Sequence, residues 1–251
     1  MENNKKKNLK SDKLEDELIV NTDPKSPISE KIRTLRTNIE FTSVDKKIKT
    51  LLVTSPTPGD GKSWLSANLA IAFAQSGKKV LLVDSDLRKG RQHKVFKIDK
   101  AYGLSNYLFT LSEKEEYEQK NSKEDIAHTK SPFYNTDINN LTVMIAGSIP
   151  PNPSELIESE KMKLFIEDMK KKFDIIIFDG SPVNVVTDSL ILSRMVDASV
   201  LVASVKNTQM KQLEIAKKSI DNVGGKVIGV VINKMPIKKT KEYKKYYSYY
   251  N

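Results

Sequence analysis

The chain has 251 residues, a net charge of +10 and 38% hydrophobic and 29% charged residues, which fits one α/β domain with polar segments and excludes wholesale disorder. It has no cysteine, which excludes disulfide bonds and thiolate metal sites or nucleophiles. No apolar run approaches the roughly 18–20 residues of a membrane-spanning helix, and the start is polar and basic, so we expect a soluble, cytoplasmic protein without a secretory signal.

Strand-length apolar runs alternate with helical patterns along most of the chain. Their richness in Val, Ile and Leu predicts a parallel sheet that crossover helices cover on both faces. The predicted elements in chain order are helix Ile28–Phe41, strand Thr50–Ser55, helix Lys62–Gln75, strands Lys79–Asp84 and Leu141–Ala146, helix Ser154–Lys172 with Ser154 as its N-cap, strand Phe173–Asp179, helix Asp188–Val196, strand Ala198–Val205, helix Thr208–Val223 and strand Lys226–Asn233.

Three segments fall outside this alternation. Residues 1–27 are polar and are expected to be a flexible N-terminal segment, residues 112–139 are charged and are expected to be a surface insertion, and residues 236–251 are expected to be a disordered basic tail. The folded domain is therefore predicted over residues 28–235.

The strongest motif joins the first predicted strand to the helix that follows it. The connecting run reads Pro58, Gly59, Asp60, Gly61, Lys62, Ser63 and Trp64. In a phosphate-binding loop, glycines let backbone N–H groups turn toward phosphates, the lysine reaches the β- and γ-phosphates, and the serine hydroxyl ligates Mg²⁺. The order strand, loop, helix predicts an ATP and Mg²⁺ site. The alternative is an ordinary glycine-containing turn, because Pro56 stands where the general motif has glycine.

Three aspartates lie at the ends of two later strands: Asp84 and Asp179 end them, and Asp86 follows the first. We expect them beside this loop because parallel strands end at the same edge of a sheet. Asp84 and Asp179 suit Mg²⁺ binding together with Ser63. Asp84 or Asp86 suits orienting or deprotonating a hydroxyl that attacks a phosphate. Arg88 could balance this charge or contact a phosphate. Taken singly, each acid could also be a solvated or turn-capping residue.

Asn233 ends the last predicted strand. Its amide offers both a donor and an acceptor, so it could read the adenine ring. The alternative is an asparagine that forms a turn.

These motifs together resemble those of the bacterial tyrosine kinases that regulate capsule and exopolysaccharide synthesis. Pro58–Ser63 looks like the family's Walker A motif, Leu81–Lys89 is similar to its second acidic motif, and Asp174–Asp179 corresponds to Walker B. The resemblance implies a three-layer α/β P-loop fold of the deviant Walker A class, with a mostly parallel central sheet flanked by helices. Partitioning ATPases share this class but usually carry an early lysine in the loop, and Ser55–Asp60 has none.

Two further features agree with the resemblance. Glu30, Arg33 and Arg36 match the family's Glu-x-x-Arg-x-x-Arg motif, which implies ring-like self-assembly, although a solvated helix face is the alternative. The tail holds five lysines against one glutamate, which gives +4 of the net charge. It also holds Tyr243, Tyr246, Tyr247, Tyr249 and Tyr250, a cluster of the kind that family members autophosphorylate.

The resemblance implies a protein-tyrosine kinase that uses ATP and Mg²⁺, phosphorylates its own tail and other protein tyrosines, and regulates polysaccharide synthesis. It also implies a membrane adaptor that completes the active site and recruits the protein to the inner face of the membrane. Trp64 replaces the threonine that most relatives have. A partitioning-type ATPase and a non-catalytic, nucleotide-gated scaffold are the alternatives, and we expect no nucleic acid as a partner.

Overall fold

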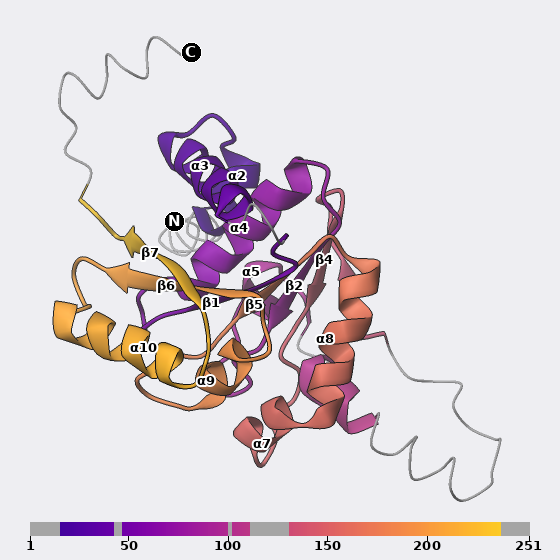
Figure 1. The fold of residues 1–251 in the computed structure, drawn as a ribbon. Coiled ribbons are helices and arrows are strands. Elements are labelled where there is room, and N and C mark those ends of the chain that lie inside the picture. The colour runs from indigo at the N-terminus through magenta and orange to yellow at the C-terminus, as the bar shows by residue number, and fades with distance from the viewer. Residues whose placement is uncertain (1–15, 43–46, 100–101, 111–130, 237–251) are drawn as a thin grey trace, which may run out of the picture.

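A mostly parallel sheet forms the centre of the computed structural model, which describes residues 16–42, 47–99, 102–110 and 131–236 (Figure 1). Within those residues the sheet has seven strands in the order β3-β4-β2-β5-β1-β6-β7. Neighbouring strands are parallel except β3, which runs antiparallel to β4. The strands are β1 Thr50–Thr54, β2 Val80–Asp84, β3 Tyr134–Asn135, β4 Leu141–Met144, β5 Ile175–Asp179, β6 Ala198–Ser204 and β7 Val227–Asn233.

Helices cover both faces of this sheet, so the predicted three-layer α/β P-loop fold is confirmed (Figure 1). Helix α4 lies directly on one face, and α2 and α3 pack over α4. Helices α7 to α10 cover the opposite face. The helices are η1 Asp16–Leu18, α2 Ile19–Thr22, α3 Pro27–Phe41, α4 Lys62–Gln75, α5 Gln92–Val95, α7 Pro153–Glu158, α8 Glu160–Lys172, α9 Asp188–Ser193 and α10 Met210–Asn222.

The central strands owe their position to continuous apolar runs. Every residue of β1, β2, β5 and β6 is buried, as expected for strands covered on both faces. The register pairs Asp84 at the end of β2 with Asp179 at the end of β5. Strand β1 lies next to β5 and leads directly toward α4. This arrangement brings the predicted loop and acids to one edge of the sheet.

The N-terminal boundary differs from the prediction, because residues 16–22 are folded. Val20 is fully buried, and its backbone N–H donates to the Asn68 side-chain oxygen at 3.0 Å. The Asn68 amide donates to the carbonyl of Glu17 at 2.8 Å. The prediction of a flexible segment over residues 1–27 is therefore wrong for this part: its short apolar run covers α4. Residues 1–15 and the predicted tail from residue 237 lie outside the described residues.

The helix predicted over Ser154–Lys172 is two helices, α7 and α8. Ser159 has an extended backbone, and its hydroxyl accepts a hydrogen bond from the N–H of Met162, so it caps α8 and interrupts the helix. Ser154 is not a cap. Its hydroxyl instead contacts Asp188 at 2.6 Å.

The predicted surface insertion over residues 112–139 is also corrected at its end. Tyr134 lies in the antiparallel strand β3, and both Tyr134 and Ile138 pack against the core. The Tyr134 hydroxyl donates to the carbonyl of Tyr102 at 2.8 Å. A two-residue strand and a single turn of helix such as α5 carry too little periodicity to predict from sequence.

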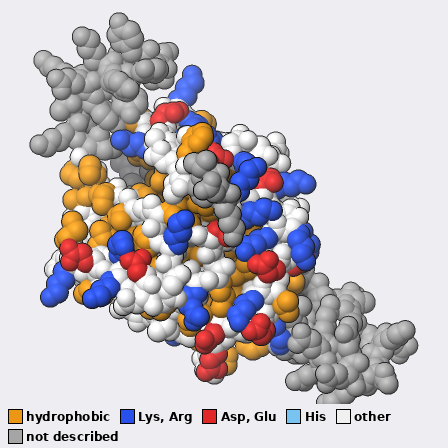
Figure 2. All heavy atoms as spheres, in the orientation of Figure 1, with side chains coloured by type: hydrophobic (Ala, Val, Ile, Leu, Met, Phe, Trp, Pro, Cys, Tyr) orange, Lys and Arg blue, Asp and Glu red, His pale blue; other side chains and the backbone are white. Residues whose placement is uncertain are grey.

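Strand β7 is the edge of the sheet beside β6. Its outer surface keeps large apolar side chains exposed, among them Val230 and Ile232. Figure 2 shows hydrophobic side chains gathered on the side of the molecule where Figure 1 places β6, β7 and α10. The strand ends at Asn233, beside the loop between β1 and α4, and so contributes to the site described next.

Candidate functional site

The loop between β1 and α4 has the backbone shape of a phosphate cradle. Gly59 and Gly61 have φ angles of 83° and 99°, in the left-handed region that residues with a Cβ rarely adopt. A Cβ on Gly61 would also collide with the Asn233 amide, which approaches closely from β7. Gly61 caps α4, so the N-terminus of that helix faces the loop. These features suit the binding of an anion.

Asp60 shapes the loop from inside the protein. Its fully buried carboxylate accepts hydrogen bonds from the Thr57 N–H at 3.1 Å, the Thr57 hydroxyl at 2.9 Å and the Thr208 hydroxyl at 2.8 Å. The carboxylate therefore faces protein donors, and a phosphate could be contacted only through the backbone of this residue. Thr208 follows β6, and no motif in the sequence indicated its part in the loop.

Lys62 forms an ion pair with Asp86, at 3.2 Å between Nζ and Oδ2. The other oxygen of Asp86 accepts from the Lys89 N–H at 2.9 Å. Burial lowers the pKa of Lys62, but the carboxylates of Asp179, Asp86 and Asp84 outweigh that effect, and the net pKa lies above its usual value. The loop lysine therefore stays charged and is held by an acid on the next strand–helix connection.

Asp84 and Asp179 are fully buried side by side at the ends of β2 and β5. Burial raises the pKa of the Asp84 carboxyl well above its usual range, and the negative charge of Asp179 adds to the rise. Burial likewise raises the pKa of Asp179, which hydrogen-bonds the Ser63 hydroxyl. Two adjacent buried carboxylates need a nearby positive charge to remain ionised together.

The residues at this point fit Mg²⁺ in its usual protein setting. Asp84 Oδ1 is buried without a hydrogen-bond partner among the described residues, so one carboxylate oxygen is available. No group of three or more His, Cys, Asp or Glu side chains among those residues is arranged to hold a metal by itself. Mg²⁺ typically takes one or two carboxylates together with water and substrate phosphates, and Asp84, Asp179 and Ser63 supply that kind of incomplete set.

Gln92, the first residue of α5, joins these groups and was missed by the sequence analysis. Its side-chain amide donates to Asp179 Oδ2 at 2.8 Å and to the Ser63 carbonyl at 3.1 Å. Its backbone N–H donates to Asp84 Oδ2 at 2.8 Å. Because α5 is only one turn long, no local pattern pointed to this residue.

A cavity of about 460 Å³ opens beside the loop, within the size range of ligand pockets. Its lining comes from four parts of the chain: Glu17, Gly59, Gly61, Lys62, Ser63, Trp64, Arg91, Val95, Asn233 and Lys234. Glu17 belongs to the N-terminal part that was predicted to be flexible, and it pairs with Arg91 at 3.2 Å. The phosphate loop and the N-terminal helices therefore share one pocket.

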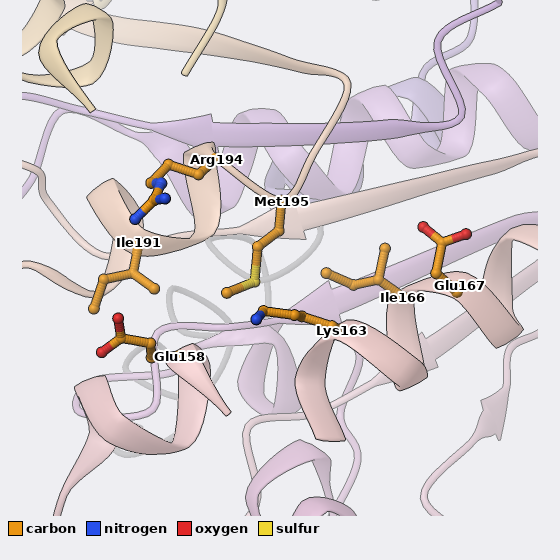
Figure 3. A pocket seen from close by; sticks show the side chains of 7 residues that line it. All are labelled: Glu158, Lys163, Ile166, Glu167, Ile191, Arg194 and Met195. Carbon is orange, nitrogen blue, oxygen red and sulfur yellow. The ribbon is translucent and has the colours of Figure 1, made fainter. Parts of the chain in front are cut away.

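A second cavity, of about 430 Å³, lies between α8 and α9. Figure 3 shows Met195 pointing into the space between Ile191 and Ile166, with Lys163, Arg194, Glu158 and Glu167 around it. Its charges are of both signs and none of its residues belongs to the phosphate loop. This cavity is therefore not the nucleotide site.

Known proteins are similar to this chain in sequence and in fold. Residues 48–226 match the family described as AAA domain. The chain is 40% identical over 230 residues to the putative tyrosine-protein kinase CapB of Staphylococcus aureus, over 92% of this chain and 94% of that protein. It is 39% identical over 231 residues to the tyrosine-protein kinase YwqD of Bacillus subtilis, over 92% and 91% of the two chains.

The chain belongs to the bacterial tyrosine kinase family. The solved kinase domain of the Escherichia coli tyrosine kinase ETK has the same fold, with a TM-score of 0.75 and 28% identity over 89% of this chain and 83% of that chain. The phosphate loop of this kinase, its three aspartates and Gln92 thus lie in a domain whose relatives carry the name of tyrosine kinases.

Arg88 and Asn233, which were predicted to contact the nucleotide, form hydrogen bonds with other groups of the kinase. Arg88 forms two hydrogen bonds with Asp188, at 2.9 and 3.2 Å, and reaches Ser154 at 3.1 Å, so its charge is balanced by an acid that the sequence analysis did not consider. The Asn233 amide donates to the Asp60 carbonyl at 2.9 Å, and its oxygen accepts from the Lys234 N–H. Phosphate contact by Arg88 and adenine recognition by Asn233 stay predictions.

The motif predicted for self-assembly lies on α3. Glu30 and Arg33 form an ion pair, and Arg33 also donates to the Pro24 carbonyl at 2.7 Å. Arg36 donates to the Ala72 carbonyl at the end of α4, at 3.2 Å. These contacts stay within the chain, so ring formation by the kinase stays a prediction. The five tail tyrosines lie outside the described residues.

Proposed function

We propose that this kinase transfers the γ-phosphoryl group of ATP to tyrosine, on its own C-terminal cluster and on other proteins. The observation that carries the proposal is Asp86, a buried acid paired with Lys62 beside two further carboxylates. Asp84 and Asp179, with Ser63, form the kind of set that Mg²⁺ takes together with water and substrate phosphates. Asp86 therefore remains as the acid that accepts the proton of an attacking hydroxyl, once the nucleotide phosphates replace Asp86 as the partner of Lys62.

The residues then have separate roles. Lys62 and the loop N–H groups hold the β- and γ-phosphates, while Ser63, Asp84 and Asp179 would hold Mg²⁺, which neutralises charge on the phosphate oxygens when bound. The tyrosine oxygen forms a bond to the γ-phosphorus as the bond to the β–γ bridging oxygen breaks. The hydroxyl proton passes to the Asp86 carboxylate. Since tyrosine has a pKa near 10, the carboxylate assists only while the hydroxyl is attacking.

A partitioning-type ATPase and a nucleotide-gated scaffold are the competing functions. The fold is compatible with both. The absence of an early lysine in Ser55–Asp60 and the tyrosine-rich tail favour the kinase, because the tail supplies acceptors that an ATPase does not need.

The test is a phosphorylation assay on the full chain with ATP and Mg²⁺, with and without the cytoplasmic tail of a membrane adaptor. Phosphate mapped by mass spectrometry to Tyr243–Tyr250, and lost in Lys62→Met, supports the kinase. Free phosphate without modified protein supports the ATPase. If neither phosphotyrosine nor free phosphate forms, the nucleotide-gated scaffold is the remaining function.

The resemblance also supports a membrane adaptor that completes the site at the inner face of the membrane and couples the kinase to capsule or exopolysaccharide synthesis. We expect weak activity from the purified chain alone and a rise when the adaptor tail is added. Vigorous tail phosphorylation without the adaptor contradicts this part. Among the described residues, no helix has the length and apolar character to cross a membrane.

A further inference from the structure

Gln92 hydrogen-bonds two of the three aspartates of the site, Asp84 and Asp179. It is completely buried at the start of α5. Its backbone N–H holds one oxygen of Asp84, and its side-chain amide holds one oxygen of Asp179 and the carbonyl of Ser63. One residue therefore fixes the orientation of both carboxylates and of the first turn of α4.

The chemistry of these contacts determines which way the side-chain amide points. The NH₂ group faces two oxygens, the Asp179 carboxylate and the Ser63 carbonyl, and neither can donate a hydrogen bond. A reversed amide would place its oxygen against both of them, so the orientation is set by the hydrogen-bond network. The amide oxygen Oε1 consequently points away from these acceptors.

That oxygen is buried and has no hydrogen-bond partner among the described residues. Asp84 Oδ1, on the carboxylate that Gln92 holds, is in the same condition. Buried acceptors without a donor are rare in folded proteins, and each calls for a missing partner. A water bound to Mg²⁺ has two strongly polarised O–H donors and is the kind of partner that both oxygens lack.

We propose that Gln92 is the positioning residue of the magnesium site. It holds Asp84 and Asp179 through its N–H groups and accepts a hydrogen bond from a magnesium-bound water through Oε1. The inference rests on the proposed nucleotide–Mg²⁺ site but not on the identity of the phosphate acceptor. A glutamine that served only to donate to Asp179 and the Ser63 carbonyl would use its NH₂ group alone, and this role gives no reason for an acceptor buried without a donor.

The test compares ADP binding by the full chain in EDTA and across a Mg²⁺ titration, using isothermal calorimetry. Gln92→Met keeps the backbone bond to Asp84 and nearly the same volume but removes the side-chain amide. We expect the Mg²⁺ concentration that gives half of the maximal gain in ADP affinity to rise about tenfold or more. This is the usual effect of losing a group that supports metal ligands. The ADP affinity in EDTA should change less than twofold.

The control is Lys171→Met, an exposed residue at the end of α8 on the opposite face of the sheet, which should leave both affinities unchanged. An unchanged Mg²⁺ requirement in Gln92→Met, or an equal loss of ADP affinity with and without Mg²⁺, overturns the inference. A wild-type protein that binds Mg²⁺ and ADP but phosphorylates no tyrosine contradicts the proposed kinase function and leaves the inference about Gln92 intact.

A measurement on the wild-type protein covers the case in which Gln92→Met does not fold. The chain has five glutamines, so selective ¹⁵N labelling gives a short, assignable set of side-chain amide signals. Adding Mg²⁺ to the ADP complex should shift the Gln92 signal beyond the shift caused by ADP alone. A Gln92 signal that does not respond to Mg²⁺ contradicts the proposal.

Discussion

Asp60 and Asp86 both lie at the phosphate loop, but their partners differ in kind. Asp86 pairs with the Lys62 ammonium, for which nucleotide phosphates compete. Asp60 accepts from a backbone N–H and two hydroxyls of Thr57 and Thr208, and none of these faces a phosphate in the proposed complex. Asp60 is therefore expected to shape the loop both before and after nucleotide binds.

Replacing Asp60 with asparagine tests this role. One of its acceptor oxygens becomes a donor that faces other donors, and a lost hydrogen bond to a charged group is worth about 1.5–3 kcal/mol. We expect ADP affinity to fall by roughly tenfold, measured by calorimetry. Asp221→Asn, which removes an exposed partner of Lys217, is the control and should bind ADP normally. Equal affinities in the two variants would rule out the loop-shaping role.

Asp197 is a second acid whose surroundings predict a measurable effect, here on stability. It accepts three hydrogen bonds of 2.9 Å, from the N–H groups of Lys49 and Thr50 and the Thr50 hydroxyl. Partial burial raises the pKa of Asp197, but these hydrogen bonds outweigh it, and the net pKa lies below the usual value. The folded state therefore favours the charged form.

A group whose pKa is depressed on folding stabilises the protein fully above its unfolded pKa, near 4, and loses that effect as pH falls through the folded pKa. Asp197→Asn should thus lower the free energy of unfolding at pH 7, and the difference from wild type should shrink in the acid range below pH 4. Urea unfolding at both pH values measures this. A difference that is constant with pH would exclude the carboxylate charge as the cause.

At the scale of elements, the N-terminal helices are attached to α4 through few polar contacts. Asn68 is fully buried and supplies two of them, accepting from the Val20 N–H and donating to the carbonyl of Glu17, while its amide also donates to the Trp64 carbonyl within α4. Since Glu17 lines the cavity beside the phosphate loop, this attachment also sets one wall of the nucleotide pocket.

Asn68→Ala should release this wall without unfolding the sheet. The substitution leaves the Val20 N–H and the Glu17 carbonyl without their partner, which costs about 1–3 kcal/mol for each buried group left unsatisfied. Amide hydrogen exchange over residues 18–22 should accelerate at least tenfold, while β1 and β5 keep their protection. Asn38→Ala, on the exposed side of α3, serves as the control. Unchanged exchange over residues 18–22 would show that these helices stay attached without Asn68.

The sequence predicted the parallel strands well, because each is a short run of mostly branched apolar residues of strand length. The prediction from sequence was wrong or incomplete where the local structure depends on contacts between residues far apart in the chain. Residues 16–22 have too few apolar positions to indicate folding on their own, and Asn68 provides their partner. Ser159 breaks a helix whose apolar spacing continues across it. In the site, motif spacing located Lys62 and the aspartates, whereas Gln92 and Thr208 contribute through tertiary contacts that leave no pattern along the chain.

At the scale of the whole molecule, the basic tail and the proposed phosphorylation lead to a prediction about assembly. Each phosphate adds about −1.5 to −2 charge, so a few events reverse the tail's +4, which comes from five lysines and one glutamate. We expect the phosphorylated protein to leave an assembly that the unmodified protein forms, and light scattering after incubation with ATP and the adaptor tail measures its mass.

The control for this experiment replaces all five tail tyrosines with phenylalanine, which keeps the lysines and removes the acceptors. That variant should remain assembled in ATP. An unchanged mass of the fully phosphorylated wild type would refute the charge switch while leaving the kinase function intact.

The strand order has a consequence for how the site comes into being. Among the described residues, β1, which leads into the phosphate loop, pairs with β5 and β6, and Thr50 lies opposite Ile176. During synthesis the loop therefore emerges long before its neighbours in the sheet, and these non-local pairings make folding intrinsically slow. The pocket beside the loop also contains Asn233 at the end of β7, and Thr208 after β6 holds Asp60, so we expect the site to be complete only after β7 has left the ribosome. Nucleotide binding is thus a late event in the folding of this chain, available only to a nearly complete domain.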